Sequence, residues 1–454
     1  MPTVVEADHS EPVLQVGGGG SPHASIAPPG RAPAYGPKVT RCCDSVGRVR
    51  SVSSEALRQR IAALADGQPR IVASGNHAPP WALLEVAEAA LPSYRLFMLN
   101  APAGVPDRPG VVLETPFVGA GMRGRPTLAY YPSRLSLVPA LLQRRAQPDV
   151  VLVHVSPPRD GLLSLGIEVN VLPAALEAAR GRGALVVAQI NPRMPYTSGD
   201  ALLSVADVDL AVEVEAPLDE LHRAEIGSVQ AVIGEHVASL VPDAATLQLG
   251  IGAIPDATLA GLHERRGLRI WSEMISDGVM VLDRKGSLAD EVVTTSFAAG
   301  SQELYDWLDG NRRVTFVRTE RANDPAVIAR QPRMTSINAA LQVDLFVQAN
   351  ASYVHGRIYS GFGGQTDFVV GALHSAGGRA IIGLPSWHER SDKSTIVEHL
   401  TSPATSFQHS YVVTDQGIAH IWGRPQREQA RELIDHAAAP QVRDELHKVA
   451  ARLF

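Results

Sequence analysis

The chain is poor in cysteine and in aromatic residues, and each shortage excludes a class of protein. Only two cysteines occur among 454 residues, the adjacent pair Cys42 and Cys43, so neither a disulfide framework nor a cysteine-based zinc cluster can form. Aromatic residues make up 5% of the chain, too few for the stacking platforms that bind single-stranded nucleic acid. We therefore expect a protein of the reducing cytoplasm that binds no nucleic acid.

Long apolar runs and an excess of positive charge are also missing. No segment approaches the roughly 18 uninterrupted apolar residues of a membrane span, and the N-terminus lacks the basic start and apolar core of a signal peptide. The 41 basic and 47 acidic residues leave a net charge of −6, which excludes a polycation built for nucleic acid. We expect no membrane partner.

What the chain does contain is an alternation of apolar runs and helix-like segments. Apolar runs at 149–158 and 184–192 flank a helix-like segment at 172–183 that ends in glycine. The same alternation recurs along the rest of the sequence, and the hydrophobic fraction of 45% is enough for a sizeable core. This pattern predicts an α/β fold with buried, mainly parallel sheets.

The first part of the chain has the composition of a disordered tail. Residues 1–48 are dense in glycine and proline and carry few apolar residues at any period, so they have little with which to build a core. The first helical pattern follows at 53–64, with Ser53 or Ser54 as its N-cap.

Two segments that lie far apart in the sequence are similar to each other. The stretch at 165–187 aligns with the stretch at 362–383. The matched pairs include Gly166 with Gly363, Glu168 with Gln365 and Asn170 with Asp367. Any turn–helix–strand unit can produce such a match, and so can two related α/β domains. On the second interpretation the domains are 49–235 and 236–454.

The strongest local signal is LQLGIGAIPDATLAGL at 247–262. Gly250 and Gly252 follow a strand-like run, and a helix is predicted to begin near Pro255. Such a turn lets the backbone approach a ligand, and the helix N-terminus favours an anion such as a phosphate. The pattern is not the dinucleotide fingerprint GxGxxG. A tight strand–helix turn without any ligand would look the same.

The segment SEMISDG at 272–278 places two acids directly after an apolar strand. Glu273 and Asp277 would lie at the carboxyl edge of a sheet, where α/β proteins bind ligands. They could form an acid/base pair or a metal pair, although a helix cap and a solvated side chain are the commoner arrangement. The 15 histidines include no HExxH motif, and we expect no metal site.

A glycine-rich segment, YSGFGGQTDF at 359–368, has three glycines within four residues. Their uncovered N–H groups can form an oxyanion hole, because they direct fixed dipoles at developing negative charge. The alternative is a flexible loop. The polar side chains of Gln365 and Asp367, which follow immediately, argue against a loop that is only flexible.

Taken together, these segments resemble the acetyl-CoA hydrolase/transferase family, a branch of the class I CoA-transferases. The likeness runs from about residue 70 to about residue 440 and includes, in the family's order, VSPPRDGLLSLG, INPRMPYTSGD, LQLGIGAIPDATLAGL, SEMISDG, NDPAVIARQPRMTSIN, YSGFGGQTDF and YVVTDQG. The resemblance implies two similar open α/β domains with the active site in the cleft between them. It also implies acyl-CoA and a small carboxylate as substrates, no tightly bound cofactor, and a homodimer.

The resemblance further implies roles for individual residues. The SEMISDG match places the catalytic glutamate at Glu273, and the NDPAVIAR match makes Asn323 its polar partner. The match around GGQTDF places the backbone oxyanion donor at or beside Gly364. The residues implied to bind CoA are Gly250, Gly252, Gly363 and Gln365.

The sequence departs from the family's pattern at two positions that are expected near the pocket. Asp415 stands where relatives commonly carry glutamate, and Val370 where they often carry arginine. We therefore expect an acyl acceptor less polar than succinate. Three functions stay open: a CoA-transferase, an acyl-CoA hydrolase that uses the same glutamate, and a non-catalytic CoA-binding subunit.

Overall fold

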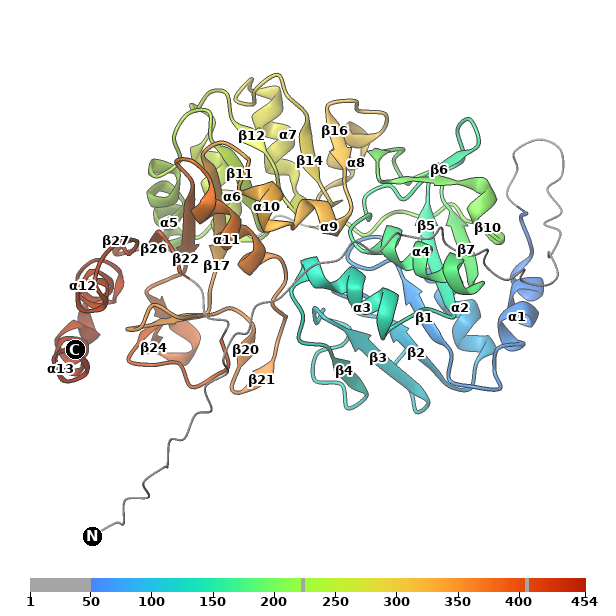
Figure 1. Ribbon diagram of the computed structural model, residues 1–454, viewed down its shortest axis with the longest axis horizontal. Helices are drawn as coiled ribbons and strands as arrows, with labels where there is room; N and C mark the ends of the chain where they lie inside the picture. Colours follow the sequence, from blue (N-terminus) through green and yellow to red (C-terminus); the bar gives the residue numbers. More distant parts are fainter. Residues whose placement is uncertain (1–49, 222–224, 405–407) are drawn as a thin grey trace, which may run out of the picture. The chain divides into compact units, whose positions relative to one another are not determined.

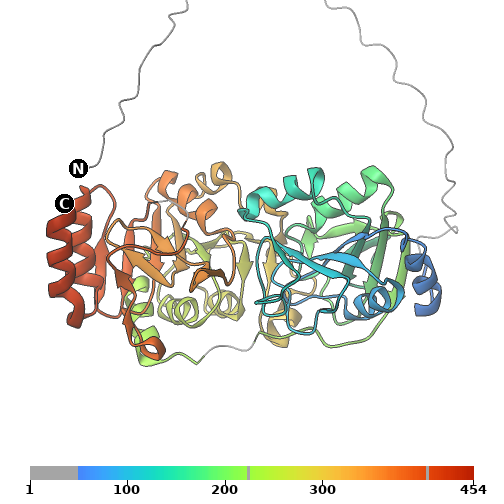
Figure 2. The ribbon, with the colours of Figure 1, turned by 90° about the horizontal axis from the view of Figure 1, so that it is seen from below.

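The computed structural model describes residues 50–221, 225–404 and 408–454. The tail predicted at residues 1–48 lies outside the described residues. All described residues belong to one compact unit, in which open β-sheets carry helices on their faces (Figures 1 and 2). This confirms the predicted α/β class with mainly parallel sheets. We call residues 50–221 the first half and residues 225–454 the second half.

The first half contains a sheet of seven parallel strands in the order β10-β7-β5-β1-β2-β3-β4. The strands are β1 (Arg70–Ala73), β2 (Tyr94–Phe97), β3 (Val111–Thr115), β4 (Leu128–Tyr130), β5 (Val150–Val155), β7 (Leu185–Ile190) and β10 (Leu210–Glu213). The chain builds β2 to β4 on one side of β1 and then returns to the other side with β5. Ligands of α/β proteins bind at such a reversal.

The second half repeats this arrangement in a sheet with the order β12-β11-β17-β22-β26-β27. The strands are β11 (Thr246–Leu249), β12 (Arg269–Ile270), β17 (Met334–Ala339), β22 (Arg379–Gly383), β26 (Tyr411–Thr414) and β27 (Gly417–His420). All pairs are parallel except the hairpin of β26 and β27. Here the order reverses between β11 and β17.

The two segments that resemble each other in sequence occupy equivalent places in the two sheets. Helix α4 (Leu172–Arg182) precedes β7, which follows β5 outward from β1. Helix α11 (Gln365–His374) precedes β22, which follows β17 outward from β11. Gly166 and Gly363, matched in sequence, both have a left-handed backbone, with φ of 60° and 55°, which glycine adopts without strain. The two halves therefore share one local design.

The domain boundary between residues 235 and 236 stays a prediction. The boundary falls inside α5 (Ser228–Ser239), which packs on α6 (Ala253–Gly261) and on strands β22 and β26 of the second half. The start of the first helix agrees with the local sequence. Ser53 caps α1 (Ser54–Ala62) by accepting a hydrogen bond from the backbone N–H of Ala56 at 3.3 Å, as predicted.

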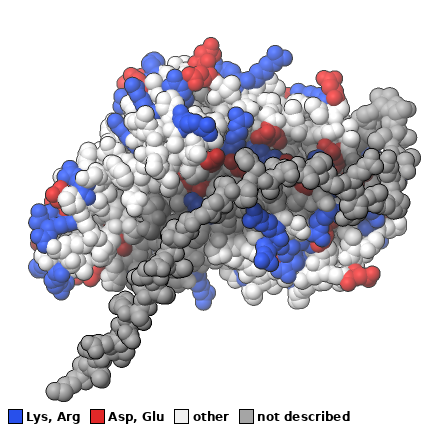
Figure 3. Space-filling model, viewed as in Figure 1, with Lys and Arg blue, Asp and Glu red and all other residues white. Residues whose placement is uncertain are grey.

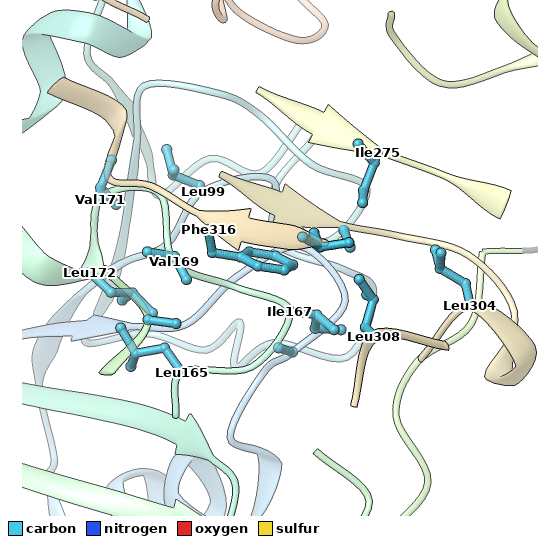
Figure 4. Close-up of a cluster of buried hydrophobic side chains, with 14 of the residues drawn as sticks. Leu99, Leu165, Ile167, Val169, Val171, Leu172, Ile275, Leu304, Leu308 and Phe316 are labelled. Carbon is cyan, nitrogen blue, oxygen red and sulfur yellow. The ribbon is translucent and has the colours of Figure 1, made fainter. Parts of the chain in front are cut away.

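A shared apolar core joins the two halves, as the close-up in Figure 4 shows. The buried side chains drawn there come from both halves: Leu99, Leu165, Ile167, Val169, Val171 and Leu172 from the first, and Ile275, Leu304, Leu308 and Phe316 from the second. Strand β8 (Ser198–Gly199) also pairs in parallel with β16 (Val314–Phe316). Because burial of apolar surface is the dominant stabilising term in folding, this core holds the halves in one arrangement.

The described surface is mixed in charge. On the face drawn in Figure 3, basic and acidic side chains are interspersed. Several charged side chains of the described residues form ion pairs, such as Arg159 with Asp309 at 3.0 Å. Within the part of the chain that the structure describes, no helix combines the length and the apolar character needed to cross a bilayer.

One buried carboxylate ties together three strands of the first sheet. Glu114 of β3 is fully buried and accepts hydrogen bonds from Arg70 Nε of β1 and Arg95 Nε of β2, both at 2.6 Å, and from the Tyr131 hydroxyl at 2.9 Å. Burial by itself would raise the pKa of Glu114, but the hydrogen bonds from the two arginines outweigh it and hold the pKa below its ordinary value.

We predict that Glu114→Gln lowers the free energy of unfolding by about 3 kcal/mol, because two partly buried guanidinium groups lose their counter-charge. The lowered pKa means that this stabilisation is present above the ordinary glutamate pKa and is lost as the pH falls through the folded-state value. Urea unfolding at neutral pH measures the loss. Glu55→Gln, in the exposed pair with Arg58, is the control and should leave the transition where it is. Equal transitions for Glu114→Gln and the wild type would contradict the prediction.

Candidate active site

A cavity of about 250 Å³ lies between the two halves, at the carboxyl ends of their strands. It is small compared with the roughly 300–1,000 Å³ of typical ligand pockets. The first half lines it with Asn76, Leu99, Asn100, Phe117, Leu135 and Asn170. The second half lines it with Gln248, Leu249, Gly250, Ile251, Glu273, Met274, Phe297, Asn338, Ala339, Ala351 and the segment 360–365. The cavity thus reaches the point in each sheet where the strand order reverses, as expected for a ligand site.

The structure brings most of the predicted site residues together here. Five of them line the cavity: Glu273, Gly250, Gly363, Gly364 and Gln365. The other two are not among the lining residues. Asn323 is fully buried against Glu273, and Gly252 caps helix α6 without being one of the lining residues.

The Glu273 carboxylate lies close to the backbone at Gly364. Glu273 lies between β12 and β13 (Met274–Ile275), and its carbonyl oxygen accepts hydrogen bonds from the N–H groups of Ser296 and Phe297, both at 3.0 Å. A Cβ placed on Gly364 would lie 1.8 Å from Glu273 Oε2, well inside van der Waals contact. No residue larger than glycine therefore fits at position 364 while the carboxylate keeps its place.

Asn323 orients the carboxylate from the other side. Its Nδ2 donates a hydrogen bond to Glu273 Oε2 at 2.8 Å. Asn323 ends the short helix α9 (Thr319–Ala322), where its backbone N–H bonds to the carbonyl of Thr319. The Asn323 Oδ1 atom is buried and has no hydrogen-bond partner among the described residues, so the side chain serves the glutamate through its amide N–H group.

The surroundings of Glu273 favour its neutral, protonated form more strongly than bulk water does. Burial raises the pKa of Glu273 to about 7; the hydrogen bond from Asn323 opposes this rise and the negative charge of Asp367 adds to it. Asp367 is itself fully buried and accepts from the Ser136 hydroxyl at 2.9 Å, with Arg134 Nη1 at 3.4 Å. None of the lining residues is a lysine, arginine or histidine, so no cation in the wall pairs with Glu273.

Helix α11 presents its N-terminus beside this carboxylate. Gly364 is its N-cap and Gln365 its first residue, so the first N–H groups of the helix have no intrahelical partner and carry partial positive charge. Gln365 Nε2 is buried without a partner in the described structure. The loop before the helix is tied to the first half, because the Leu135 N–H donates to the Gly363 carbonyl at 2.9 Å. Of the two sequence interpretations, the flexible loop is therefore the weaker.

The glycine turn after β11 forms another part of the wall. Gly250 and Ile251 line the cavity, and Gly252 has a left-handed φ of 112°. Helix α6 begins at Ala253, two residues before the predicted start near Pro255, because Gly252 rather than the proline ends the turn.

Asp277 does not share the site with Glu273. It is the first residue of α7 (Asp277–Arg284), and its carboxylate accepts from the Ser301 N–H at 3.2 Å and from the Ser301 hydroxyl. It is not one of the lining residues of the cavity. Of the alternatives open from the sequence, the structure favours a carboxylate that begins a helix over an acid/base or metal pair.

The two departures from the family's pattern lie outside the cavity wall. Neither Val370 nor Asp415 is among the residues that line the cavity, so the expectation of an acyl acceptor less polar than succinate stays a prediction. Asp415 instead accepts hydrogen bonds from the Ser386 N–H and hydroxyl at 2.6 and 2.9 Å. It therefore holds the turn after β22.

Sequence reasoning missed the asparagines on the opposite wall. Asn76 and Asn100 follow β1 and β2, and both have a left-handed backbone. The sequence singles out Asn170 only as one position in the match between the two similar segments. Polar residues placed directly after two buried strands of a parallel sheet are the signal that would have found the first two.

Comparison with known proteins agrees with this geometry. Residues 300–450 match the acetyl-CoA hydrolase/transferase C-terminal domain. The chain is 40% identical over 330 residues to the 4-hydroxybutyrate coenzyme A transferase of Clostridium kluyveri, covering 70% of this chain and 76% of that protein. It is 37% identical over 337 residues to the succinyl-CoA:acetate/propanoyl-CoA:succinate CoA transferase of Fasciola hepatica, covering 71% and 69%. Relatives named acetyl-CoA hydrolase match at 27–32% identity.

The fold is similar to a solved structure over almost its whole length. RipA from Yersinia pestis superposes with a TM-score of 0.80 at 28% sequence identity, covering 88% of this chain and 99% of that one. The shared sequence, the two-halved fold and the glutamate in the cavity between the halves lead to one assignment: this chain belongs to the acetyl-CoA hydrolase/transferase family.

Proposed function

We propose that this protein transfers CoA from an acyl-CoA to a short carboxylic acid, with Glu273 as the nucleophile. The observation that carries the proposal is the contact of the Glu273 carboxylate with Gly364 at the N-terminus of α11, on one side, and with the Asn323 amide on the other. A carboxylate held beside uncovered backbone N–H groups has both parts that acyl transfer needs, a nucleophile and an oxyanion donor.

The reaction proceeds through covalent intermediates on this one side chain. A Glu273 oxygen attacks the thioester carbonyl, the carbon–sulfur bond breaks, and CoA leaves as the thiolate while a mixed anhydride remains. The thiolate then attacks the glutamyl carbonyl and expels the first acid as its carboxylate, which leaves a glutamyl-CoA thioester. A second carboxylate attacks this thioester and the same steps run in reverse, so that the thioester energy is conserved.

Each tetrahedral intermediate places negative charge on an oxygen that needs a fixed donor. The Gly364 N–H group and the N-terminus of α11 supply it, and one such donor is worth about 3 kcal/mol of transition-state stabilisation. Because Gly364 has no side chain, the Glu273 carboxylate can lie directly against the backbone at the start of α11. The turn at Gly250 and Ile251 lets the backbone approach the CoA chain closely.

Transfer is favoured over the two alternatives that the sequence left open. CoA binding alone, as in a non-catalytic subunit, does not require a carboxylate that an amide orients against a helix N-terminus. Hydrolysis needs water at the glutamyl thioester, and the wall of the cavity is largely apolar, with Leu99, Phe117 and Phe362 among its residues. We further propose that the protein acts in the cytoplasm as a homodimer; light scattering of the purified protein tests the assembly.

We predict that borohydride captures the glutamyl-CoA thioester of the wild-type enzyme incubated with an acyl-CoA. Reduction converts one side chain to an alcohol, which peptide mass spectrometry should locate at Glu273. Glu273→Ala should abolish both the label and the formation of new CoA esters from a panel of carboxylates. Glu303→Gln, an exposed glutamate of α8 (Gln302–Leu308), is the control and should keep both. A label on another acid, or transfer by Glu273→Ala, would refute the assignment.

We predict that Gly364→Ala lowers kcat about a hundredfold or more while the protein still folds. The new methyl group would displace the carboxylate, since its Cβ lies 1.8 Å from Glu273 Oε2 and 2.3 Å from Asn323 Nδ2, and such misplacement of a reacting group costs about this much in rate. Gly181→Ala is the matched control, because a Cβ at Gly181 meets nothing within 4 Å. Wild-type kcat for Gly364→Ala would contradict the close contact.

We predict that kcat/KM for the acyl-CoA depends on one ionisation with a midpoint near the pKa of Glu273, about 7. Only the anion attacks, so the rate should rise with pH through this value and level off above it. Asn323→Ala should move the midpoint to higher pH, because the lost hydrogen bond stabilises the anion. A wild-type midpoint near the ordinary glutamate value would show that burial does not control this group.

A further inference from the structure

Two asparagines that line the cavity, Asn76 and Asn170, hold a buried carboxylate that the proposed mechanism does not use. Glu168 is 1% exposed and forms none of the ion pairs found among the described residues. Its oxygens accept instead from amides. Asn76 Nδ2 lies 2.9 and 3.0 Å from the two oxygens, and Asn170 Nδ2 lies 2.7 Å from Oε1. A buried carboxylate satisfied only by neutral donors is costly, which points to a role for the amides that it holds.

Glu168 fixes the orientation of the Asn76 side chain, and Asn76 in turn fixes the orientation of the Asn100 side chain. An ionised carboxylate only accepts hydrogen bonds, so the Asn76 amide must turn its NH2 group towards Glu168 and its Oδ1 away. That Oδ1 accepts from Asn100 Nδ2 at 3.0 Å, which turns the Asn100 carbonyl oxygen away from Asn76. Asn100 lines the cavity, and its Oδ1 has no hydrogen-bond partner in the described part of the protein.

Backbone geometry alone does not explain these asparagines. Asn76 and Asn100 have φ of 46° and 43°, a left-handed conformation that asparagine tolerates and glycine adopts more easily. Glycine would satisfy the backbone at both positions. The amide chain from Glu168 through Asn76 to Asn100 is therefore an additional feature, and it ends at the cavity surface.

The rest of the wall limits what Asn100 can meet. The lining residues include no lysine, arginine or histidine, so a second carboxylate on the acyl chain would be desolvated without a counter-charge. Leu99, Phe117 and Leu135 line the cavity on the first-half side together with Asn100. This wall suits methylene groups that carry one neutral polar group.

We infer that Asn100, oriented by Asn76 and Glu168, determines acyl specificity by accepting a hydrogen bond from a neutral donor on the acyl chain, of which a hydroxyl is the simplest. A hydroxyl both donates to the Asn100 carbonyl and accepts from a remaining amide hydrogen. An ionised carboxylate cannot donate, and a methyl group leaves the amide unsatisfied. This inference rests on the proposed function, and Asn76 and Glu168 act in it as positioning residues.

The test compares three four-carbon acids that differ only in the distal group: 4-hydroxybutyrate, butyrate and succinate. Each serves as CoA acceptor from acetyl-CoA, and kcat/KM is measured for each. Burial raises the pKa of Glu168 to about 7, so the assays are run at about pH 8, where this carboxylate is ionised. We expect 4-hydroxybutyrate to exceed both other acids by about tenfold or more, the effect of a buried amide left without a partner.

Asn100→Gly keeps the left-handed backbone and removes the amide. We expect the ratio of kcat/KM for 4-hydroxybutyrate over butyrate to fall at least about tenfold. Glu168→Gln, which has the same shape but places an amide donor towards Asn76, should lower the ratio in the same direction. Asp160→Gly is the matched control: it is an exposed left-handed residue, with φ of 50°, outside the cavity, and it should keep the wild-type ratio.

Two results would overturn the inference while CoA transfer stands. One is a wild-type enzyme that prefers butyrate or succinate; the other is an Asn100→Gly enzyme that keeps the wild-type ratio. Failure of the proposed function looks different, because then none of the acids forms a CoA ester and no borohydride label appears at Glu273. That outcome would overturn both proposals.

Discussion

The apolar core shared by the two halves is the constraint on which the site depends. Buried side chains from both halves pack together (Figure 4), and β8 pairs with β16 across the boundary. The cavity takes lining residues from each half, so its width is set by how closely this core packs. Protein cores are packed as densely as organic crystals, and a cleft built on one is held at a defined width before any substrate arrives.

Within that cleft, the two walls have different kinds of chemistry. The second-half wall brings together a carboxylate, a helix N-terminus and a glycine turn. These are the groups that the proposed acyl transfer uses. The first-half wall carries neutral amides that the buried Glu168 orients. Neither carboxylate forms an ion pair with any residue that the structure describes, and burial raises the pKa of each to about 7. In the two proposals, covalent chemistry takes place at the second-half wall, and the amides of the first-half wall bind the acyl chain.

Small residues decide the geometry at the reacting centre. The backbone at Gly364 approaches Glu273 more closely than any side chain would permit, while Asn323 orients the same carboxylate through one hydrogen bond. The absence of a side chain at Gly364 is therefore as necessary to the site as the Glu273 carboxylate.

Much of this protein followed from its sequence. The alternation of apolar runs and helical segments indicated parallel α/β sheets, because strands buried on both faces must be apolar throughout. The motifs around Glu273, Asn323 and Gly364 identified the residues that converge. The tertiary structure alone decided that Asp277 begins a helix while Glu273 faces the cavity, since strand ends and helix starts read alike in sequence. It also brought Glu168, Asn76 and Asn100 together, because contacts between residues 24 and 92 positions apart depend on how the strands are ordered in the sheet, which no local pattern encodes.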